Sequence, residues 1–365
     1  MPSLIKTIAR STPLLTLGLL LTVSLPGWAN PQIALRPVTD GLGRVIQVET
    51  IPKRLVIAGR GTQLLTGAVY LFPELSQRLV AVSRSRQTAG FFSALDPTFS
   101  EKTPLERDVT VEDIVATQPD MVILKSELSA SLGQSLEALG IPVTYLDLET
   151  PEHYQRDLAV LGSLAQNPER AQELQTYFRT QMGRVKTALP SPLTRPSVLI
   201  LNYDQQQQPA SVQVPAPHWL QTSLTRLAGG DPVWTSATRA GVDKGWIPVD
   251  VAQIAAWDPD FIFVIDYFGD PAAAVATLTQ DPQWQTLKAV QNQRLRPFAK
   301  DLVSWDQPDP RWILGLSWLT TQLHPQTQPS LNLESLTQDF FVTIYDMDAS
   351  TYEQTLRPTL KTVLP

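Results

Sequence analysis

The sequence predicts an α/β protein of two lobes, each a mostly parallel sheet flanked by helices, with one long rigid helix joining them. Three observations predict this class. Short apolar runs recur between segments with helical patterning and Gly/Pro turns. A helical pattern continues without a break over residues 168–189. The block VEDIVATQPDMVIL at residues 111–124 has a counterpart, VDVAQIAAWDPDFIFV, at residues 249–264. Because 365 residues are enough for two packed cores, we expect one copy of the block in each lobe.

Residues 1–29 have the pattern of a secretory signal peptide. Two cations in this segment precede an apolar run at residues 14–25, and small residues lead to a cleavage site after Ala29. The apolar run is too short to cross a hydrocarbon layer about 30 Å thick. The chain contains no cysteine that could carry a lipid. We therefore expect a cleaved signal peptide and a mature periplasmic protein that is not a lipoprotein.

The mature chain is acidic. The full sequence has a net charge of −6, and removing Lys6 and Arg10 with the signal peptide lowers it to −8. Nucleic-acid binding needs clustered Lys and Arg to neutralise phosphates, so we expect no nucleic-acid partner. The lack of cysteine also excludes disulfides and thiolate metal sites.

Continuous apolar runs predict strands that helices cover on both faces. In the N-terminal lobe, residues 30–166, these runs are residues 54–59, 78–83, 120–125 and 142–147. In the C-terminal lobe, residues 191–325, they are residues 197–202, 261–266 and 294–299. Residues 326–365 are expected to form a helical tail.

Residues 167–190 are expected to form the linking helix. Asn167 is a helix cap, and Pro168 follows at the first helical position. Apolar residues then recur at spacings of three and four, as on one face of a helix. Twenty-two helical residues span about 33 Å at ~1.5 Å per residue, enough to brace two lobes.

Each copy of the repeated block is a helix that runs into Pro-Asp and then a buried strand. The dipeptides are Pro119-Asp120 and Pro259-Asp260. Proline ends the helix and aspartate favours the turn. This arrangement is common in α/β proteins, so the placement of one copy in each lobe carries more weight than the motif itself.

Five blocks, taken in their order along the chain, resemble the periplasmic substrate-binding proteins of ABC importers for iron–siderophore complexes, haem and cobalamin. They are residues 38–59, 111–124, 140–147, 309–325 and 339–356. The last block is also similar to oxyanion binders of the same superfamily. The resemblance implies a binding protein rather than an enzyme, without a cofactor, and an ABC permease of the inner membrane as its partner. We expect it to be a monomer.

Ligands of open α/β sheets bind beyond the carboxyl ends of the strands. In the first lobe, cations follow three of these ends: Arg60, then Arg84 and Arg86, and then Lys125. Thr62 stands where a helix begins, so free backbone N–H groups would add to the positive field. A charge at any single strand end is commonly just solvated. Their recurrence predicts an anion-binding wall.

The second lobe supplies aromatic residues. Trp246 precedes the second copy of the repeated block, Tyr267 and Phe268 follow a predicted strand, and Trp305 lies in a later loop. Trp234 is a further candidate. A planar or chelated ligand could stack on these rings while the arginines meet its negative charge. A ferric siderophore complex therefore ranks first as ligand, molybdate or tungstate second, and cobalamin or haem third.

Two other kinds of site are less well supported. The only histidines are His153, His218 and His324, too few for the His-rich sites that hold a bare divalent cation. An exported enzyme would need an acid/base pair, for which Asp266 and Asp301 are candidates. The chain has no hydrolase or P-loop motif.

The resemblance also implies one acidic residue per lobe that docks onto the permease. Glu112, seven residues before Pro119, matches this place in the first lobe. The corresponding position in the second lobe is Ala252, a departure from the family pattern. Asp250 is the nearby candidate, and both carboxylates could equally belong to helix starts.

Overall fold

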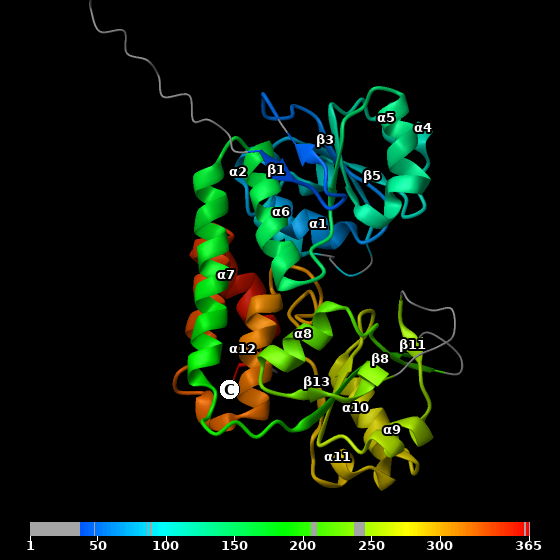
Figure 1. The fold of residues 1–365 in the computed structure, drawn as a ribbon, viewed down its shortest axis with the longest axis vertical. Coiled ribbons are helices and arrows are strands. Elements are labelled where there is room, and N and C mark those ends of the chain that lie inside the picture. The colour runs from blue at the N-terminus through cyan, green and yellow to red at the C-terminus, as the bar shows by residue number, and fades with distance from the viewer. Residues whose placement is uncertain are drawn as a thin grey trace, which may run out of the picture. The chain divides into compact units, whose positions relative to one another are not determined.

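The computed structural model describes residues 37–46, 48–85, 87, 90–205, 210–236, 245–360, 363 and 364. The predicted signal peptide and Arg86 lie outside the described residues. Two sheets with helices around them make up the fold, which confirms the predicted class (Figure 1). No helix in the described part of the chain is both long and apolar enough to span a membrane.

The first sheet has five parallel strands in the order β5-β4-β3-β6-β7. Their bounds are β3 (Leu55–Ile57), β4 (Leu79–Ser83), β5 (Thr103–Leu105), β6 (Met121–Lys125) and β7 (Val143–Leu146). The helices of this lobe are α1 (Thr62–Val69), α2 (Pro73–Ser76), α3 (Phe91–Leu95), α4 (Val111–Ala116), α5 (Gln134–Ala138) and α6 (Pro151–Leu164), with short helical turns at Phe99–Glu101, Ser126–Leu128 and Ser129–Gly133. A separate hairpin pairs β1 (Val38–Thr39) with β2 (Val45–Ile46).

The second sheet runs β11-β9-β8-β12-β13, with β10 also paired to β8. Its strands are β8 (Ser197–Asp204), β9 (Ser211–Val214), β10 (Asp231–Pro232), β11 (Ile247–Pro248), β12 (Phe261–Ile265) and β13 (Leu295–Pro297). The central pairs β8–β12 and β12–β13 are parallel, whereas β9 and β11 are added antiparallel. Its helices are α8 (Leu220–Leu227), α9 (Val251–Trp257), α10 (Pro271–Gln280) and α11 (Lys288–Gln291), with short turns at Val233–Ser236 and Trp284–Thr286.

All seven predicted strands are present, with ends no more than two residues from those expected. Apolar runs do not mark β5, β9, β10 and β11, which are only two to four residues long. The exact limits of the lobes stay a prediction.

The predicted long helix is α7 (Pro168–Ala188), 21 residues long. The Asn167 side chain accepts a hydrogen bond from the Arg170 N–H at 2.9 Å and so caps its first turn. Its apolar face packs against α6 and against α12 (Trp312–Leu323), as Figure 1 shows. The single helix α7 therefore contacts both α6, a helix of the first lobe, and α12, which lies near the C-terminal end of the chain.

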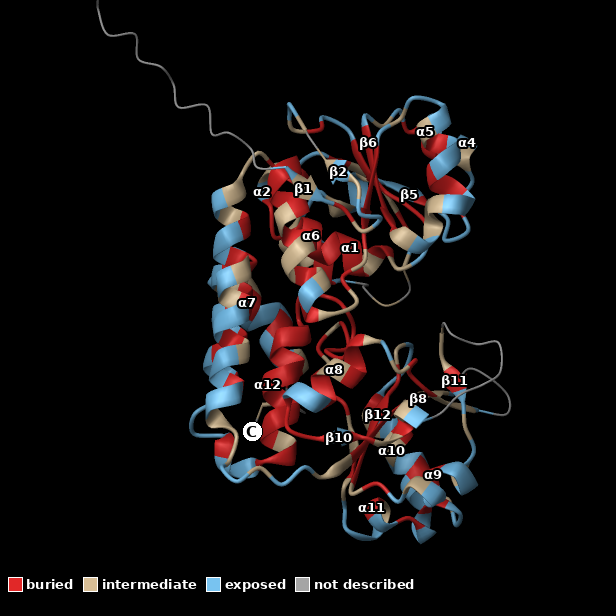
Figure 2. Cartoon of the chain, in the orientation of Figure 1, coloured by how far each residue is buried: buried red, intermediate tan, exposed pale blue. Residues whose placement is uncertain are grey.

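The C-terminal part of the chain is helical. After α12, which is almost entirely buried (Figure 2), come α13 (Leu333–Asp339) and α14 (Ala349–Thr351), with short turns at Pro325–Thr327, Phe340–Ile344, Tyr352–Leu356 and Arg357–Leu360. The ring of Phe341 lies 6.1 Å from that of Phe91 in α3, centroid to centroid. The tail thus packs back onto the first lobe.

The structure explains why Pro-Asp occurs in both copies of the repeated block. The Asp120 carboxylate accepts the backbone N–H groups of Lys53 and Arg54 at 2.8 and 2.9 Å, just before β3. The Asp260 carboxylate accepts the Ser197 N–H at 2.9 Å, at the start of β8. The aspartate does more than favour a turn, because it binds the amino end of the neighbouring strand in the same sheet.

A buried arginine organises the segment that leads into α12. Arg311 has no exposed surface, and its guanidinium pairs with Asp301 at 3.0 Å and with Asp309 at 2.6 Å. Its Cζ atom lies 3.6 Å from the centre of the Phe91 ring, a cation–π contact with α3. Asp301 also accepts the indole N–H of Trp305 at 3.0 Å. The two carboxylates and the ring together compensate the buried charge.

The same segment also supports α1. A Cβ atom at Gly67 would lie only 2.5 Å from a carboxylate oxygen of Asp309, so only glycine allows this approach. The Tyr345 hydroxyl donates to the Gly67 carbonyl at 3.0 Å. In α6, the Tyr154 hydroxyl donates to the Pro308 carbonyl at 2.8 Å. Three helices of the first lobe are thus tied to residues that lie far later in the sequence.

We expect Arg311→Leu to lower the free energy of unfolding by about 3–5 kcal/mol, because it leaves two buried carboxylates without their cation. Urea denaturation followed by circular dichroism measures this. Arg179→Leu, which removes an exposed arginine from α7, is the matched control and should change stability by less than about 0.5 kcal/mol. Equal effects of the two substitutions would contradict the role given to Arg311.

Candidate functional site

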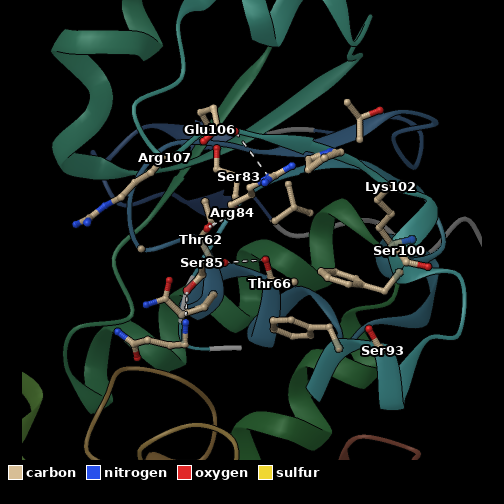
Figure 3. Close-up of a pocket in the computed structure, with 18 of the residues that line it drawn as sticks. Thr62, Thr66, Ser83, Arg84, Ser85, Ser93, Ser100, Lys102, Glu106 and Arg107 are labelled. Atoms are coloured by element: carbon tan, nitrogen blue, oxygen red, sulfur yellow. Dashed lines mark hydrogen bonds and ion pairs between the residues drawn. The ribbon is translucent and has the colours of Figure 1, made fainter. Parts of the chain in front are cut away.

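A cavity of 710 Å³ lies beyond the carboxyl ends of β3, β4 and β5, and we call it the β3–β5 pocket (Figure 3). Its location is the one expected for a ligand site of a parallel sheet. Polar side chains from three strand ends line one part of it, and phenyl rings line another. The volume falls within the range of about 300–1,000 Å³ that is usual for small-molecule sites.

The floor of the pocket is the start of α1. Gly61 adopts a left-handed φ of 72° and no side chain caps the helix, so the first-turn N–H groups and the positive end of the helix dipole face the pocket. The Thr62 hydroxyl donates to the Ser83 carbonyl at 2.8 Å, which joins α1 to β4. The Ser83 hydroxyl accepts the Gly59 N–H at 3.0 Å and donates to no other described residue.

Further hydroxyl groups surround this floor. Ser85 accepts the Gln87 N–H at 3.2 Å, and Figure 3 shows Ser93 and Ser100 on the opposite side of the pocket from it. None of these three serines donates its hydroxyl hydrogen to another described residue within the pocket. A ligand rich in oxygen atoms would therefore meet several free donors.

Among the described residues, three cations line the pocket. The Arg84 Nε atom lies 3.7 Å from a Glu106 carboxylate oxygen, and both side chains are largely exposed. Lys102 is mostly buried and pairs with Asp96 at 3.1 Å. Arg107 is exposed and forms no ion pair with any described residue. Because exposed ion pairs contribute little, Arg84 is nearly as available to an anion as Arg107.

The apolar side of the pocket contains Phe92 and Phe99, whose ring centroids are 5.2 Å apart. The Tyr70 ring packs behind both, and its hydroxyl donates to Asp96 at 2.7 Å. Burial alone raises the pKa of Asp96, but hydrogen bonds from Thr98, Tyr70 and Lys102 outweigh it and bring the pKa to about 2. The carboxylate that neutralises Lys102 therefore stays ionised at any physiological pH.

The predicted cations fall into different environments. Thr62 and Arg84 line the pocket. Arg60 does not line it, and its guanidinium instead donates to Asp108 at 2.7 Å on the surface. Lys125 is buried and donates to the Asp147 carbonyl and the Glu149 carboxylate. The structure thus assigns Lys125 to holding strand ends together.

The predicted aromatic residues are also divided. Trp246 and Tyr267 are half-buried neighbours with ring centroids 5.8 Å apart, and Trp219 extends this group at 5.5 Å from Trp246. Trp234 and Trp305 have no exposed surface and belong to the core, so they offer no face to a ligand in this structure. None of these five rings lines the β3–β5 pocket.

Tyr267 is held by a buried polar network. Its hydroxyl donates to Asp306 at 2.7 Å, and the same carboxylate accepts from Gln221 at 2.8 Å and from Ser304 at 2.5 Å. Burial raises the pKa of Asp306, although these hydrogen bonds favour the ionised form. The network fixes the aromatic group on the second lobe.

Several lining residues were missed by the sequence reasoning. Lys102 and Arg107 flank β5, whose sequence Thr-Pro-Leu gives no recognisable strand pattern, so no strand end was expected there. Nothing in the sequence around Phe92 and Phe99 indicates that their rings line a pocket. Phe268, one of the aromatic residues expected after a strand, does line the pocket.

The remaining candidates are placed as follows. Glu112 is exposed in the first turn of α4, and Asp250 is exposed and caps α9 by accepting the Gln253 N–H at 2.8 Å. Asp301 is occupied by Arg311, and Asp266 by backbone N–H groups. Within the described residues, no cluster of His, Asp and Glu could hold a metal ion.

Comparison with known proteins identifies relatives over most of the chain. The periplasmic binding protein family matches residues 98–301. The chain is 23% identical to the molybdate-binding protein MolA of Haemophilus influenzae, over 90% of this chain and 96% of that protein. It is also 23% identical to a vitamin B12-binding protein of Pectobacterium carotovorum, over 48% of this chain and 64% of that protein.

The fold is similarly shared. A periplasmic solute-binding protein from Veillonella parvula superposes with a TM-score of 0.70 at 22% identity, covering 89% of this chain and 99% of the other. At this identity the likeness shows the fold alone.

The Asp306 network leads to a prediction on pH. A folded-state pKa above the ordinary aspartate value of 3.8 means that this group favours folding most below that value, and that the contribution is lost as pH rises through the folded pKa. Asp306→Asn removes the titration and keeps the size of the side chain. From about pH 3 to pH 7, wild type should therefore lose stability relative to Asp306→Asn, measured by urea unfolding. A difference that does not change with pH would contradict this.

Proposed function

This chain belongs to the periplasmic binding proteins, and we propose that it captures an anionic iron chelate of the ferric siderophore kind and delivers it to an ABC permease. It acts as a binding protein rather than an enzyme, like the relatives that match it. The proposal rests on one observation above all: the β3–β5 pocket combines a cationic, hydroxyl-rich side with a phenyl-lined side. A chelate with negative charge and apolar ligand arms matches both sides.

The size of the pocket supports a chelate over a bare ion. A tetrahedral oxyanion would occupy only a small part of 710 Å³ and would leave the phenyl rings of the apolar side, of which Phe99 is partly exposed, without a ligand contact. A chelate of an organic ligand would cover these rings and still reach Arg84 and Arg107. Burial of apolar surface at about 25 cal/mol per Å² then adds to the charge-assisted hydrogen bonds.

The electrostatics of the pocket are compatible with an acidic protein. Glu106 offsets Arg84 only at 3.7 Å and in solvent, so a ligand carboxylate or phenolate can replace it at small cost. Arg107 has no ion-pair partner among the described residues, so a ligand anion displaces none of them when it pairs with Arg107. The open start of α1 adds a positive partial charge at the floor.

Molybdate or tungstate is the second candidate. The relative named as molybdate-binding matches 90% of this chain, and the free hydroxyls around α1 suit a compact oxyanion. Cobalamin is the ligand named for another relative, but the match to that relative covers only about half of this chain. Cobalamin makes little use of Arg84 and Arg107, and cobalamin and haem rank third.

Delivery requires a second surface, which we place at the two copies of the repeated block. Glu112 and Asp250 are both exposed and stand at the start of α4 and α9, the helices of those copies. One acidic residue near a helix start on each lobe would contact basic sites of a permease in the inner membrane, although Asp250 lies two residues before Ala252, the position that matches Glu112. The segment at residues 1–29 would direct export to the periplasm before cleavage.

Intrinsic tryptophan fluorescence of the mature protein, titrated with ferric siderophores, molybdate, tungstate, haem and cobalamin, tests the ligand. The double substitution Arg84→Ala/Arg107→Ala should weaken an iron chelate by about 1.5–3 kcal/mol for each charged hydrogen bond lost. Lys186→Ala removes one exposed cation from α7 and should leave the affinity unchanged.

Two results would contradict the proposal. Saturation by molybdate without any response to iron chelates would assign the pocket to an oxyanion. Chelate binding that is equally strong in the double variant would remove the cationic side of the pocket from the site.

A further inference from the structure

The turn that follows β12 is fixed by hydrogen bonds on both sides. One carboxylate oxygen of Asp266 accepts the N–H groups of Phe268 and Gly269, at 3.1 and 2.7 Å. The Lys300 ammonium donates to the carbonyls of Asp266 and Gly269, at 3.0 and 2.9 Å. A Cβ atom at position 269 would lie 2.5 Å from the Asp266 carboxylate, so this tight closure needs glycine. Residues 266–269 therefore form a rigid arm.

The two residues at the centre of this arm have different surroundings. The Tyr267 hydroxyl donates to Asp306, and the Tyr267 ring packs on Trp246, which anchors the arm to the second lobe. Phe268 is 37% exposed and lines the β3–β5 pocket. Among the described residues that line the pocket, Phe268 alone comes from the second half of the chain. A fixed turn thus presents one phenyl ring to a pocket built by the first lobe.

We propose that Phe268 is a specificity-determining residue, held on the ligand by the arm at residues 266–269, and that it selects chelates with an aromatic or apolar surface over bare oxyanions. The proposal rests on the proposed function of the same pocket and names the part of the ligand that is recognised. Arg84 and Arg107 recognise negative charge, which chelates and oxyanions share. Phe268, with Phe92 and Phe99 in the pocket, offers contacts that only the organic arms of a chelate can use.

Lys300 acts as a positioning residue in this arrangement. It is largely withdrawn from solvent, and burial lowers its pKa even though Asp266, Asp270, Asp301 and Asp306 favour its charge. Its ammonium bonds to backbone carbonyls at both ends of the arm and contributes no atom to the lining of the pocket. Without the two hydrogen bonds from Lys300, the arm should be mobile. Ligand binding would then have to order Phe268, at an entropy cost that is absent in the wild type.

The test compares two probes, a ferric tris-catecholate complex and sodium molybdate, on the mature protein by isothermal titration calorimetry. Phe268→Ala should weaken the chelate about tenfold and leave any molybdate affinity unchanged, since the lost contact is with an aromatic surface. Phe268→Tyr keeps the ring and should restore most of the affinity. Leu139→Ala, at an exposed apolar residue outside the pocket, is the matched control and should change neither affinity.

A double-mutant cycle separates positioning from general stability. Lys300→Met should weaken the chelate in a wild-type background, but should have no further effect when Phe268 is already alanine. A purely structural role of Lys300 predicts the same loss in both backgrounds. If Lys300→Met does not fold, the comparison of Phe268→Ala with Phe268→Tyr still decides the role of the ring.

The outcomes distinguish this inference from the proposed function. Chelate binding that depends on Arg84 and Arg107 but not on Phe268 overturns this inference alone. Equal weakening of chelate and molybdate by Phe268→Ala also overturns it, because the ring would then support the pocket without selecting a ligand. A wild-type protein that binds molybdate and no chelate overturns both proposals.

Discussion

The ion pairs of one buried arginine hold together the walls of the pocket. Arg311 pairs with Asp301 and Asp309 and lies against the Phe91 ring, all without exposure to solvent. Through Phe91 it supports α3, and through Asp309 and Gly67 it supports α1. These two helices supply the floor and the apolar side of the β3–β5 pocket. A buried charge is costly and persists only where its partners are held in place. The partners of Arg311 therefore also hold in place the helices that they contact. The pocket is therefore largely preformed before any ligand arrives.

Burial separates the cations that build the fold from those that can meet a ligand. Lys125 and Arg311 are buried and paired with carboxylates or carbonyls, and losing those partners would leave unpaired charge in the interior. Arg84 and Arg60 have exposed partners, so their pairs cost little to exchange for a ligand anion. Only the cations with exposed partners can change partners when a ligand binds. Of these two, Arg84 lines the pocket. An acidic protein can in this way present a locally positive site.

The sequence contained most of the fold because its signals are local. Apolar runs marked β3, β4, β6, β7, β8, β12 and β13. Asn167 marked the start of α7, and the repeated Pro-Asp marked the amino ends of β6 and β12. The site was harder to predict, because a position after a strand does not say where the side chain points. Trp305 follows a serine and Trp234 follows Asp-Pro-Val, and both are nevertheless core residues. Tyr267 and Phe268 are adjacent, and only the turn closed by Asp266 and Gly269 sends one inward and the other into the pocket.

The central claim is that the ligand lies against α1 and the arm at residues 266–269. Hydrogen–deuterium exchange of the mature protein, with and without a ferric tris-catecholate complex, measures this directly, since bound ligand slows local opening of the backbone it contacts. The account predicts slower exchange at residues 61–66, 83–85 and 266–269, with the second-lobe helices α9 and α11 unchanged. Protection confined to the surroundings of Trp219 and Trp246, with none at the start of α1, would place the ligand elsewhere and contradict the account.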